Sequence, residues 1–293
     1  MKKIFYIFLI ICSSLYAQKT VTVSILPQKY FVEKIAKDKV KVNVMVQPGF
    51  SPATYEPKTS QMKELINSDI YFSIGVPFEE SWLSKFTDIN KNMLLIDTSK
   101  GIKKNKMLGH HHHDEVKHEE QEHHEEHHHD EESLDPHIWL DPILVKTQAK
   151  NILDALIKVD TKNRKFYYDN YKIFLTELDN LNMNLSNILK QIKGKKFMVF
   201  HPSWGYFAKR YDLEQEAVEK EGKEPKPKEM IALIEEAKDE GIKVLFVAPQ
   251  FSKVAATTIA ENIGGSVIEI DPLSYKWEKS LLDISNKLVN TYK

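Results

Sequence analysis

The 293-residue sequence contains a single cysteine, Cys12, and this shortage limits the metal chemistry open to the protein. Cys12 lies in the segment MKKIFYIFLIICSSLYA, where two lysines precede an apolar run that begins at Ile4, and the segment ends at Ala17. The run is too short to span a membrane and is typical of a secretory signal peptide at residues 1–17. Cleavage after Ala17 leaves no disulfide and no thiolate ligand, so any metal site must use histidines and carboxylates.

This N-terminal segment predicts a periplasmic protein. Lipid attachment at Cys12 is the alternative, and the bulky Ile11 before it disfavours that reading.

Signatures of several enzymes and of nucleic-acid-binding proteins are also missing. There is no HExxH motif, no GxSxG elbow and no glycine-rich phosphate loop. Basic residues are spread along the chain, whereas nucleic-acid binding needs a concentrated basic face. Among enzymes, the alternative function for this chain is a zinc-dependent hydrolase. Water bound at an open coordination position of zinc can act as a nucleophile.

Histidine, by contrast, is concentrated in one segment. Residues 110 to 132 hold ten of the twelve histidines, ten carboxylates and only three other residues. The composition predicts disorder, since the segment cannot bury enough apolar surface to offset the entropy of ordering. Imidazole favours zinc over manganese, so we expect an accessory segment that collects metal at several weak sites. Its histidines are His110, His111, His112, His113, His118, His123, His124, His127, His128 and His129.

Outside this segment, short β-type runs alternate with helical patterns in both halves of the chain. This alternation predicts an α/β fold with parallel βαβ units in two lobes, at residues 18–159 and 194–293, with the disordered loop at about 102–133 in the first lobe. The expected strands are VTVSI, VKVNVMV, DIYFSIG and NMLLIDT in the first lobe, and KKFMVF, LEQEAVE, VLFVAP and SVIEID in the second.

A long helical pattern, about 161–193, lies between the two lobes and makes residues 160–193 a linking helix. Its apolar residues recur at alternating spacings of four and three from Tyr167 to Ile192, which forms one continuous stripe. A stripe of this kind could form a coiled-coil dimer. The flanking α/β segments favour packing across both halves of one molecule instead.

Only His137 and His201 remain outside the histidine-rich segment, and both lie where a chemical site is expected. His201 directly follows the strand KKFMVF, Asp271 ends the strand SVIEID, and His137 precedes a helix in LDPHIWLDP. Ligands in parallel sheets bind beyond the carboxyl ends of the strands, so the cleft between the lobes is the expected position of a shared metal site.

The motifs DPHIWLDP, FHPSWGYFA, EGKEPKPKE, PQFS and IEIDPL resemble those of the ZnuA-like (TroA-like, cluster A-I) solute receptors of ABC importers, which bind zinc or manganese. The resemblance implies two α/β lobes joined by one long rigid helix, with the metal in the interlobe cleft. It makes His137 and His201 histidine ligands and Asp271 the carboxylate ligand. It further implies transported Zn²⁺, with Mn²⁺ as the alternative, a membrane permease as partner, a monomer and no catalysis.

One position departs from the family pattern. The family's first histidine ligand falls in a stretch that here reads PGFSPATYEP, with Ala53 where histidine is expected. Because a methyl group cannot coordinate metal and zinc prefers four ligands, the site is one protein ligand short. A water, a histidine of the 110–132 segment, or Glu56 could complete it.

Overall fold

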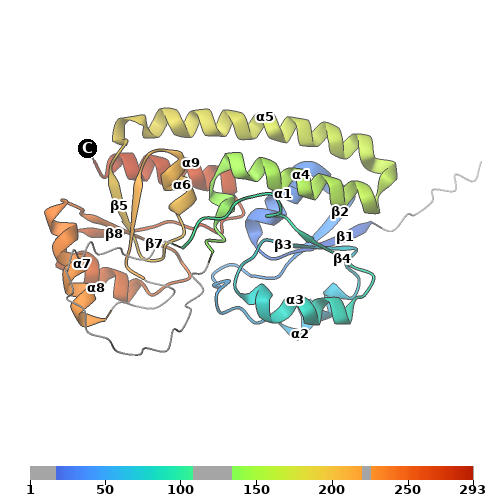
Figure 1. The fold of residues 1–293 in the computed structure, drawn as a ribbon, viewed down its shortest axis with the longest axis horizontal. Helices are drawn as coiled ribbons and strands as arrows, with labels where there is room; N and C mark the ends of the chain where they lie inside the picture. Colours follow the sequence, from blue (N-terminus) through green and yellow to red (C-terminus); the bar gives the residue numbers. More distant parts are fainter. Residues whose placement is uncertain (1–17, 108–133, 220–225, 293) are drawn as a thin grey trace, which may run out of the picture.

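The computed structural model describes residues 18–107, 134–219 and 226–292, which form two α/β lobes (Figure 1). The predicted signal peptide and residues 108–133 of the predicted loop lie outside these residues, whereas residues 102–107, expected to be part of the disordered loop, have a described conformation. Each lobe has a four-stranded parallel sheet, ordered β2-β1-β3-β4 in the first and β6-β5-β7-β8 in the second. The strands are β1 (Lys19–Val23), β2 (Val40–Val44), β3 (Ile70–Ser73), β4 (Leu94–Asp97), β5 (Lys196–Val199), β6 (Glu214–Ala217), β7 (Val244–Val247) and β8 (Ser266–Glu269).

Helices cover both faces of each sheet, because all four strands of a parallel sheet are joined by crossover segments. In Figure 1, α2 and α3 lie below the first sheet with α1 and α4 above it, and α7 and α8 lie on the corresponding lower side of the second. The helices are α1 (Leu26–Ala36), α2 (Thr59–Leu65), α3 (Phe78–Ile89), α4 (Pro142–Val159), α5 (Arg164–Leu189), α6 (Gly205–Arg210), α7 (Pro227–Asp239), α8 (Lys253–Asn262) and α9 (Trp277–Asn290). The fold class predicted from the sequence is confirmed.

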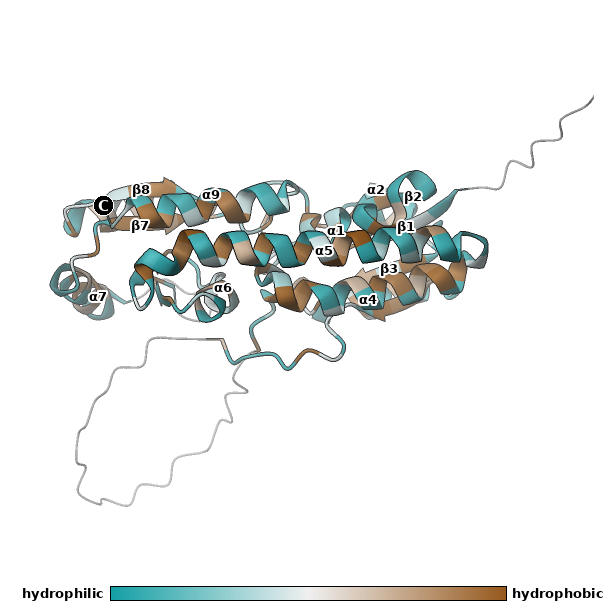
Figure 2. Cartoon of the chain, turned by 90° about the horizontal axis from the view of Figure 1, so that it is seen from above, coloured by the Kyte–Doolittle hydropathy of each residue, from teal (hydrophilic) through white to brown (hydrophobic). Residues whose placement is uncertain are grey.

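The long helix α5 spans both lobes, flanked by 3₁₀ turns at Thr161–Asn163 and Lys190–Ile192 (Figure 2). Its apolar stripe is buried at Tyr167, Phe174, Leu178, Leu181 and Leu185. The helix contacts α1 and α4 of the first lobe and α9 of the second. The prediction that the stripe packs across both halves of one molecule is therefore confirmed. Among the described residues, no helix is long and apolar enough to cross a membrane.

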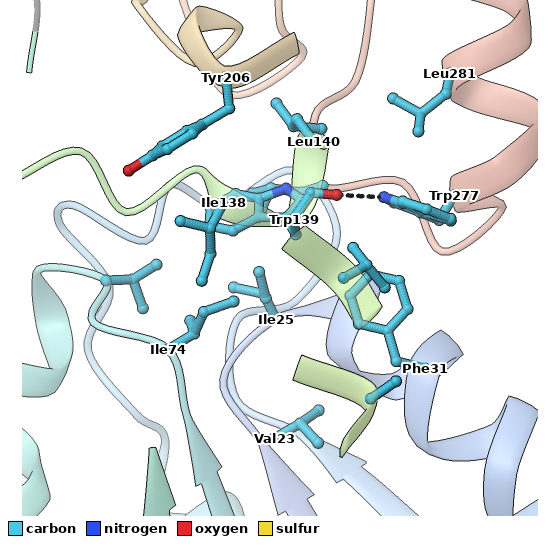
Figure 3. Close-up of a cluster of buried hydrophobic side chains, with 14 of the residues drawn as sticks. Val23, Ile25, Phe31, Ile74, Ile138, Trp139, Leu140, Tyr206, Trp277 and Leu281 are labelled. Atoms are coloured by element: carbon cyan, nitrogen blue, oxygen red, sulfur yellow. Dashed lines mark hydrogen bonds between the residues drawn. The ribbon is translucent and has the colours of Figure 1, made fainter. Parts of the chain in front are cut away.

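One hydrophobic core continues from the first lobe, through α5, into the second lobe. It includes Leu178 of α5. It also includes Val23 and Phe31 of the first lobe and Trp277 and Leu281 of α9, which Figure 3 shows. A second, smaller cluster fills the space between the second sheet and helices α7 and α8. Because burial of apolar surface is the main source of stability, the shared core holds the two lobes in one arrangement.

Two tryptophans add hydrogen bonds across the boundary between the lobes. Trp277 Nε1 donates to the carbonyl of Trp139 at 2.8 Å, a bond drawn in Figure 3. Trp139 Nε1 in turn donates to the carbonyl of Pro272, also at 2.8 Å. Both indole rings are nearly fully buried, so these bonds satisfy groups that would be costly to leave unpaired.

Candidate metal centre

His137 is held in the first lobe by the residues of its own motif, LDPHIWLDP. Its Nδ1 lies 2.7 Å from Asp135 Oδ1, and the same oxygen accepts the backbone N–H of His137 at 2.9 Å. The ring packs against Trp139, with the ring centroids 5.0 Å apart. At the far end of the motif, Asp141 caps helix α4 by accepting the N–H of Ile143 at 2.8 Å. The motif therefore fixes both the ring and the helix that follows.

His201 is held in a similar way at the carboxyl end of the second sheet. It follows β5 by two residues, and Glu219 follows the neighbouring strand β6 by two residues. Since Val199 pairs with Ala217 in the parallel register, the two side chains emerge side by side, and His201 Nδ1 lies 2.6 Å from Glu219 Oε2. On its other side, the ring stacks on Phe251 with the centroids 4.8 Å apart and the planes 22° apart.

The two carboxylates determine which nitrogen of each ring can bind a metal. Carboxylate oxygens accept hydrogen bonds, so both contacts suit the tautomer that donates from Nδ1, and this tautomer leaves each Nε2 with a free lone pair. Burial lowers the pKa of His201, and the nearby Glu219 opposes this shift. A neutral imidazole is the form that coordinates metal. The ring centroids of His137 and His201 are 5.5 Å apart, and their planes lie at 72°.

Both rings line a cleft between the lobes with a cavity volume of about 60 Å³. The first lobe contributes the segment from Ser51 to Ala53, and the second contributes Gln250 and Phe251. Most of the lining is apolar. A charged ligand in such surroundings interacts more strongly with the few polar groups present than it would in water.

Asp271, the third ligand expected from the sequence, lies beside this cleft but does not join the two histidines. Its Oδ1 accepts hydrogen bonds from Gln250 Nε2 at 3.1 Å and from the backbone N–H of Leu273 at 3.0 Å. Within residues 18–107, 134–219 and 226–292, no three His, Cys, Asp or Glu side chains are gathered closely enough to hold a metal ion.

The structure also describes Ala53 and Glu56, the two positions discussed for the histidine that the family pattern has and this chain lacks. Ala53 is exposed and lines the cleft, so a side chain at this position would lie at the cleft wall. Glu56 is exposed and is not part of the cleft lining. The ten histidines between residues 110 and 132 lie outside the described residues.

Sequence reasoning did not assign a role to Asp135, Glu219 or Phe251. Asp135 could have been found from its position two residues before His137 in the motif. Glu219 could have been found only from the pairing of β5 with β6, because eighteen positions separate it from His201. Phe251 belongs to the motif PQFS but contributes a stacking ring, which residue type alone does not distinguish from a core aromatic.

Two α/β lobes joined by one long helix, with a histidine from each lobe lining the cleft between them, have the architecture of a metal-binding solute receptor. The comparison with known families agrees. The chain belongs to the family described as zinc-uptake complex component A, periplasmic (ZnuA), whose model matches residues 21–293.

Individual relatives extend this result. The high-affinity zinc uptake system protein ZnuA of Bacillus subtilis is 29% identical over 254 residues, which are 84% of this chain and 76% of that protein. A solved structure of a zinc-bound ZnuA deletion mutant is 40% identical, with a TM-score of 0.82, and the match covers 93% of this chain and 97% of that one. A manganese-bound periplasmic metal-binding protein from Candidatus Liberibacter asiaticus is 20% identical with a TM-score of 0.77, covering 94% and 100%, and shows a shared fold alone.

Proposed function

We propose that this protein is the receptor of an ABC importer, that it captures Zn²⁺ in the interlobe cleft and that it delivers the ion to a membrane permease. The observation that carries the proposal is the pair of histidines from different lobes, each with its Nδ1 held by a buried carboxylate and its Nε2 left to coordinate. Carboxylate–histidine–metal arrangements orient the ring and raise the basicity of the ligand nitrogen. We assign His137 and His201 as the first two ligands.

We assign Asp271 as the third ligand. Both of its hydrogen bonds, from Gln250 and from Leu273, go to Oδ1, so Oδ2 is the oxygen that we assign to the ion. A small movement of the part of the cleft that carries Asp271 would bring its carboxylate to His137 and His201. Because Ala53 supplies no donor, a water or a histidine of the 110–132 segment completes four-coordination.

Zinc is the favoured ion because two imidazoles and one carboxylate are typical of zinc sites, whereas manganese is better suited to sites built mainly from oxygen ligands. The Bacillus subtilis relative is named as a zinc uptake protein, and the related solved structure holds zinc. Manganese remains the alternative cargo within the same receptor role. The manganese-bound neighbour shares the fold only and does not change this preference.

We further propose a periplasmic monomer that catalyses no reaction. The apolar N-terminal run, the family's periplasmic description and its role in uptake support this assignment. The histidine-rich segment, with its ten histidines and ten carboxylates, is assigned to collecting zinc at weaker sites near the cleft.

Zinc titration of two matched variants tests this proposal. His201→Ala should abolish tight zinc binding and leave weak binding of several ions. His118→Ala removes one histidine of the 110–132 segment and should leave the tight site unchanged. Deleting residues 110–132 should lower the number of ions bound while one tight ion remains. Unchanged tight binding in His201→Ala would refute the cleft assignment, and loss of the tight ion in the deletion would make a segment histidine the missing ligand.

The receptor role is tested by growth of the source organism under zinc limitation. Removing the gene should impair growth, and added zinc, not manganese, should restore it. Complementation with wild type but not with His201→Ala would tie uptake to the cleft. Restoration by manganese alone would instead support the alternative cargo.

A further inference from the structure

The two ends of the histidine-rich segment are joined at its base, just outside the cleft. Asp135 donates its backbone N–H to the carbonyl of Asn105 at 2.9 Å, and Lys106 forms an antiparallel bridge with Leu134. Residues 105–106 and 134–135 therefore form a short paired base. The position at which the chain returns to the cleft is set by this pairing.

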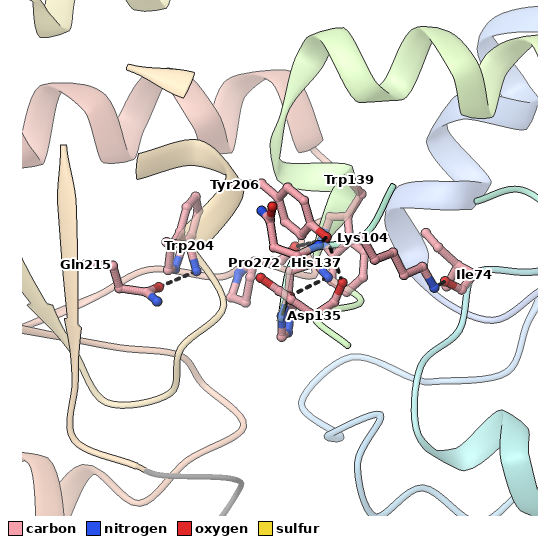
Figure 4. A network of polar contacts seen from close by, with 10 residues as sticks. Ile74, Lys104, Asp135, His137, Trp139, Trp204, Tyr206, Gln215 and Pro272 are labelled. Carbon is pink, nitrogen blue, oxygen red and sulfur yellow. Dashed lines mark hydrogen bonds and ion pairs between the residues drawn. The ribbon is translucent and has the colours of Figure 1, made fainter. Parts of the chain in front are cut away.

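A side chain of the second lobe holds both ends of this base. The hydroxyl of Tyr206, in helix α6, accepts the backbone N–H of Asn105 at 2.9 Å and donates to the carbonyl of Asp135 at 3.0 Å. Figure 4 shows the ring of Tyr206 directed at this point, beside Asp135 and His137. The hydroxyl thus uses both its donor and its acceptor capacity on the two ends of one segment.

Asp135 connects this contact to the metal centre. Its main chain is held by Asn105 and Tyr206, and its side chain is held by His137, with Oδ1 accepting from both Nδ1 and the backbone N–H. Asp135 is only 4% exposed, so it has little room to adopt another rotamer. A displacement of its backbone would therefore be passed to the ring of His137.

The first residue of α6 adds a second contact to the same carboxylate. A Cβ atom added to Gly205 would lie 3.3 Å from Asp135 Oδ2, closer than ordinary van der Waals contact. The absence of a side chain at Gly205 thus makes room for the carboxylate. Two neighbouring residues of the second lobe, Gly205 and Tyr206, together define where Asp135 lies.

We infer that Tyr206 and Asp135 are positioning residues for zinc, and that the second lobe fixes the orientation of a ligand in the first lobe, His137, through them. This inference rests on the proposed function. Neither residue touches the ion: Tyr206 holds the backbone of Asp135, and Asp135 holds the ring that coordinates.

Zinc affinity of the full-length protein, measured by competition with a chromophoric chelator, tests the inference. Asp135→Ala should weaken zinc binding by about 10- to 100-fold, as is usual when a partner of a histidine ligand is removed. Asp135→Asn keeps an oxygen for His137 and should restore most of this loss. Tyr206→Phe removes both hydrogen bonds of the hydroxyl, which act on the ligand only through Asp135, and should weaken zinc binding by about 2- to 10-fold.

The matched control is Tyr211→Phe, which removes a hydroxyl of the same type that contacts Asn182 and has no link to the cleft. It should leave zinc affinity unchanged. Gly205→Ala crowds Asp135 without removing any hydrogen bond, and it should weaken zinc binding even though alanine favours the helix. Thermal unfolding of each metal-free variant separates a loss of affinity from a loss of stability.

Equal zinc affinities for Tyr206→Phe, Gly205→Ala and the Tyr211→Phe control would overturn the inference while leaving the proposed function in place. An Asp135→Asn variant as weak as Asp135→Ala would also overturn it, since the charge of Asp135 rather than its positioning would then be responsible. A wild-type protein without a tight zinc site would overturn the proposed function and this inference together. Zinc titration of the wild-type protein detects that outcome before any variant is compared.

Discussion

Part of the pH dependence of this protein's stability should come from a buried carboxylate, Glu79, at the start of helix α3. Its side chain is 2% exposed and accepts the N–H groups of Ile74 at 3.0 Å and Gly75 at 2.7 Å. It also receives a short hydrogen bond from the Ser24 hydroxyl, which contacts the Tyr71 hydroxyl at 2.7 Å. Burial raises the pKa of Glu79 from 4.5 to about 7, and these hydrogen bonds and the charge of Lys104 oppose the shift only in part.

The magnitude follows from the size of this pKa change. Each unit of pKa difference between the folded and unfolded chains corresponds to about 1.4 kcal/mol, so Glu79 accounts for about 3 kcal/mol of pH-dependent stability. Because the folded pKa is the higher one, the folded protein keeps a proton that the unfolded chain releases. The stabilisation is complete below pH 4.5, falls as the pH rises and is lost above a pH of about 7.

The variant Glu79→Gln isolates this contribution. A glutamine amide resembles the protonated acid, because its nitrogen can donate to Ser24 while its oxygen accepts from Gly75. Relative to wild type, the variant should gain up to about 3 kcal/mol in free energy of unfolding between pH 5 and pH 8.5. Urea unfolding of the metal-free proteins across this pH range measures the difference.

The neighbouring Glu80→Gln is the matched control, since Glu80 is exposed in the same first turn of α3. Its difference from wild type should stay nearly constant over the same range. If the Glu79→Gln difference is equally flat, the carboxylate does not titrate near neutrality in the folded protein, and the reasoning from its burial is refuted.

Two further predictions concern the missing ligand and the lobe boundary. Ala53→His places an imidazole in the cleft lining and should tighten zinc binding by about tenfold or more. Thr54→His, at a position outside the lining, is the control and should leave zinc affinity unchanged. Equal zinc affinities of the two variants, measured by chelator competition, would count against the assigned metal position. Trp277→Phe removes the donor to the buried carbonyl of Trp139 and should lower the free energy of unfolding by about 1–3 kcal/mol in urea titrations, and a smaller loss would show that this bond contributes little.

The sequence predicted the parts of this fold that depend on local patterns. Alternating strands and helices, the stripe on α5 and the positions of His137 and His201 at expected ligand-binding ends are all set by residues close together in the chain. The helices α2 and α3 were expected only as helix-length segments between strands. Local pattern was thus sufficient for the architecture and for two side chains of the candidate site.

The partners of those side chains depend on which strands become neighbours. Glu219 meets His201 because β5 and β6 pair in register, and Tyr206 meets Asp135 because α6 packs on the turn after the histidine-rich segment. Neither relation has a local signal. The distance of Asp271 from the histidines has the same origin, since it depends on how β8 and the segment after it sit against the other lobe.

The continuity of the core limits how the cleft can admit and release an ion. Trp139, Trp277 and Tyr206 are all buried at the boundary between the lobes, and each aromatic side chain of this kind buries about 150–250 Å². At about 25 cal/mol per Å², exposing the three would cost about 11–19 kcal/mol, without counting the hydrogen bonds between the lobes. Wide opening at this boundary would therefore cost as much as the total stability of a typical domain. The Asp271 carboxylate is held by two hydrogen bonds to Oδ1, from Gln250 and from Leu273, so we expect the movement that completes the metal site to be local to this side chain and not a rotation of whole lobes.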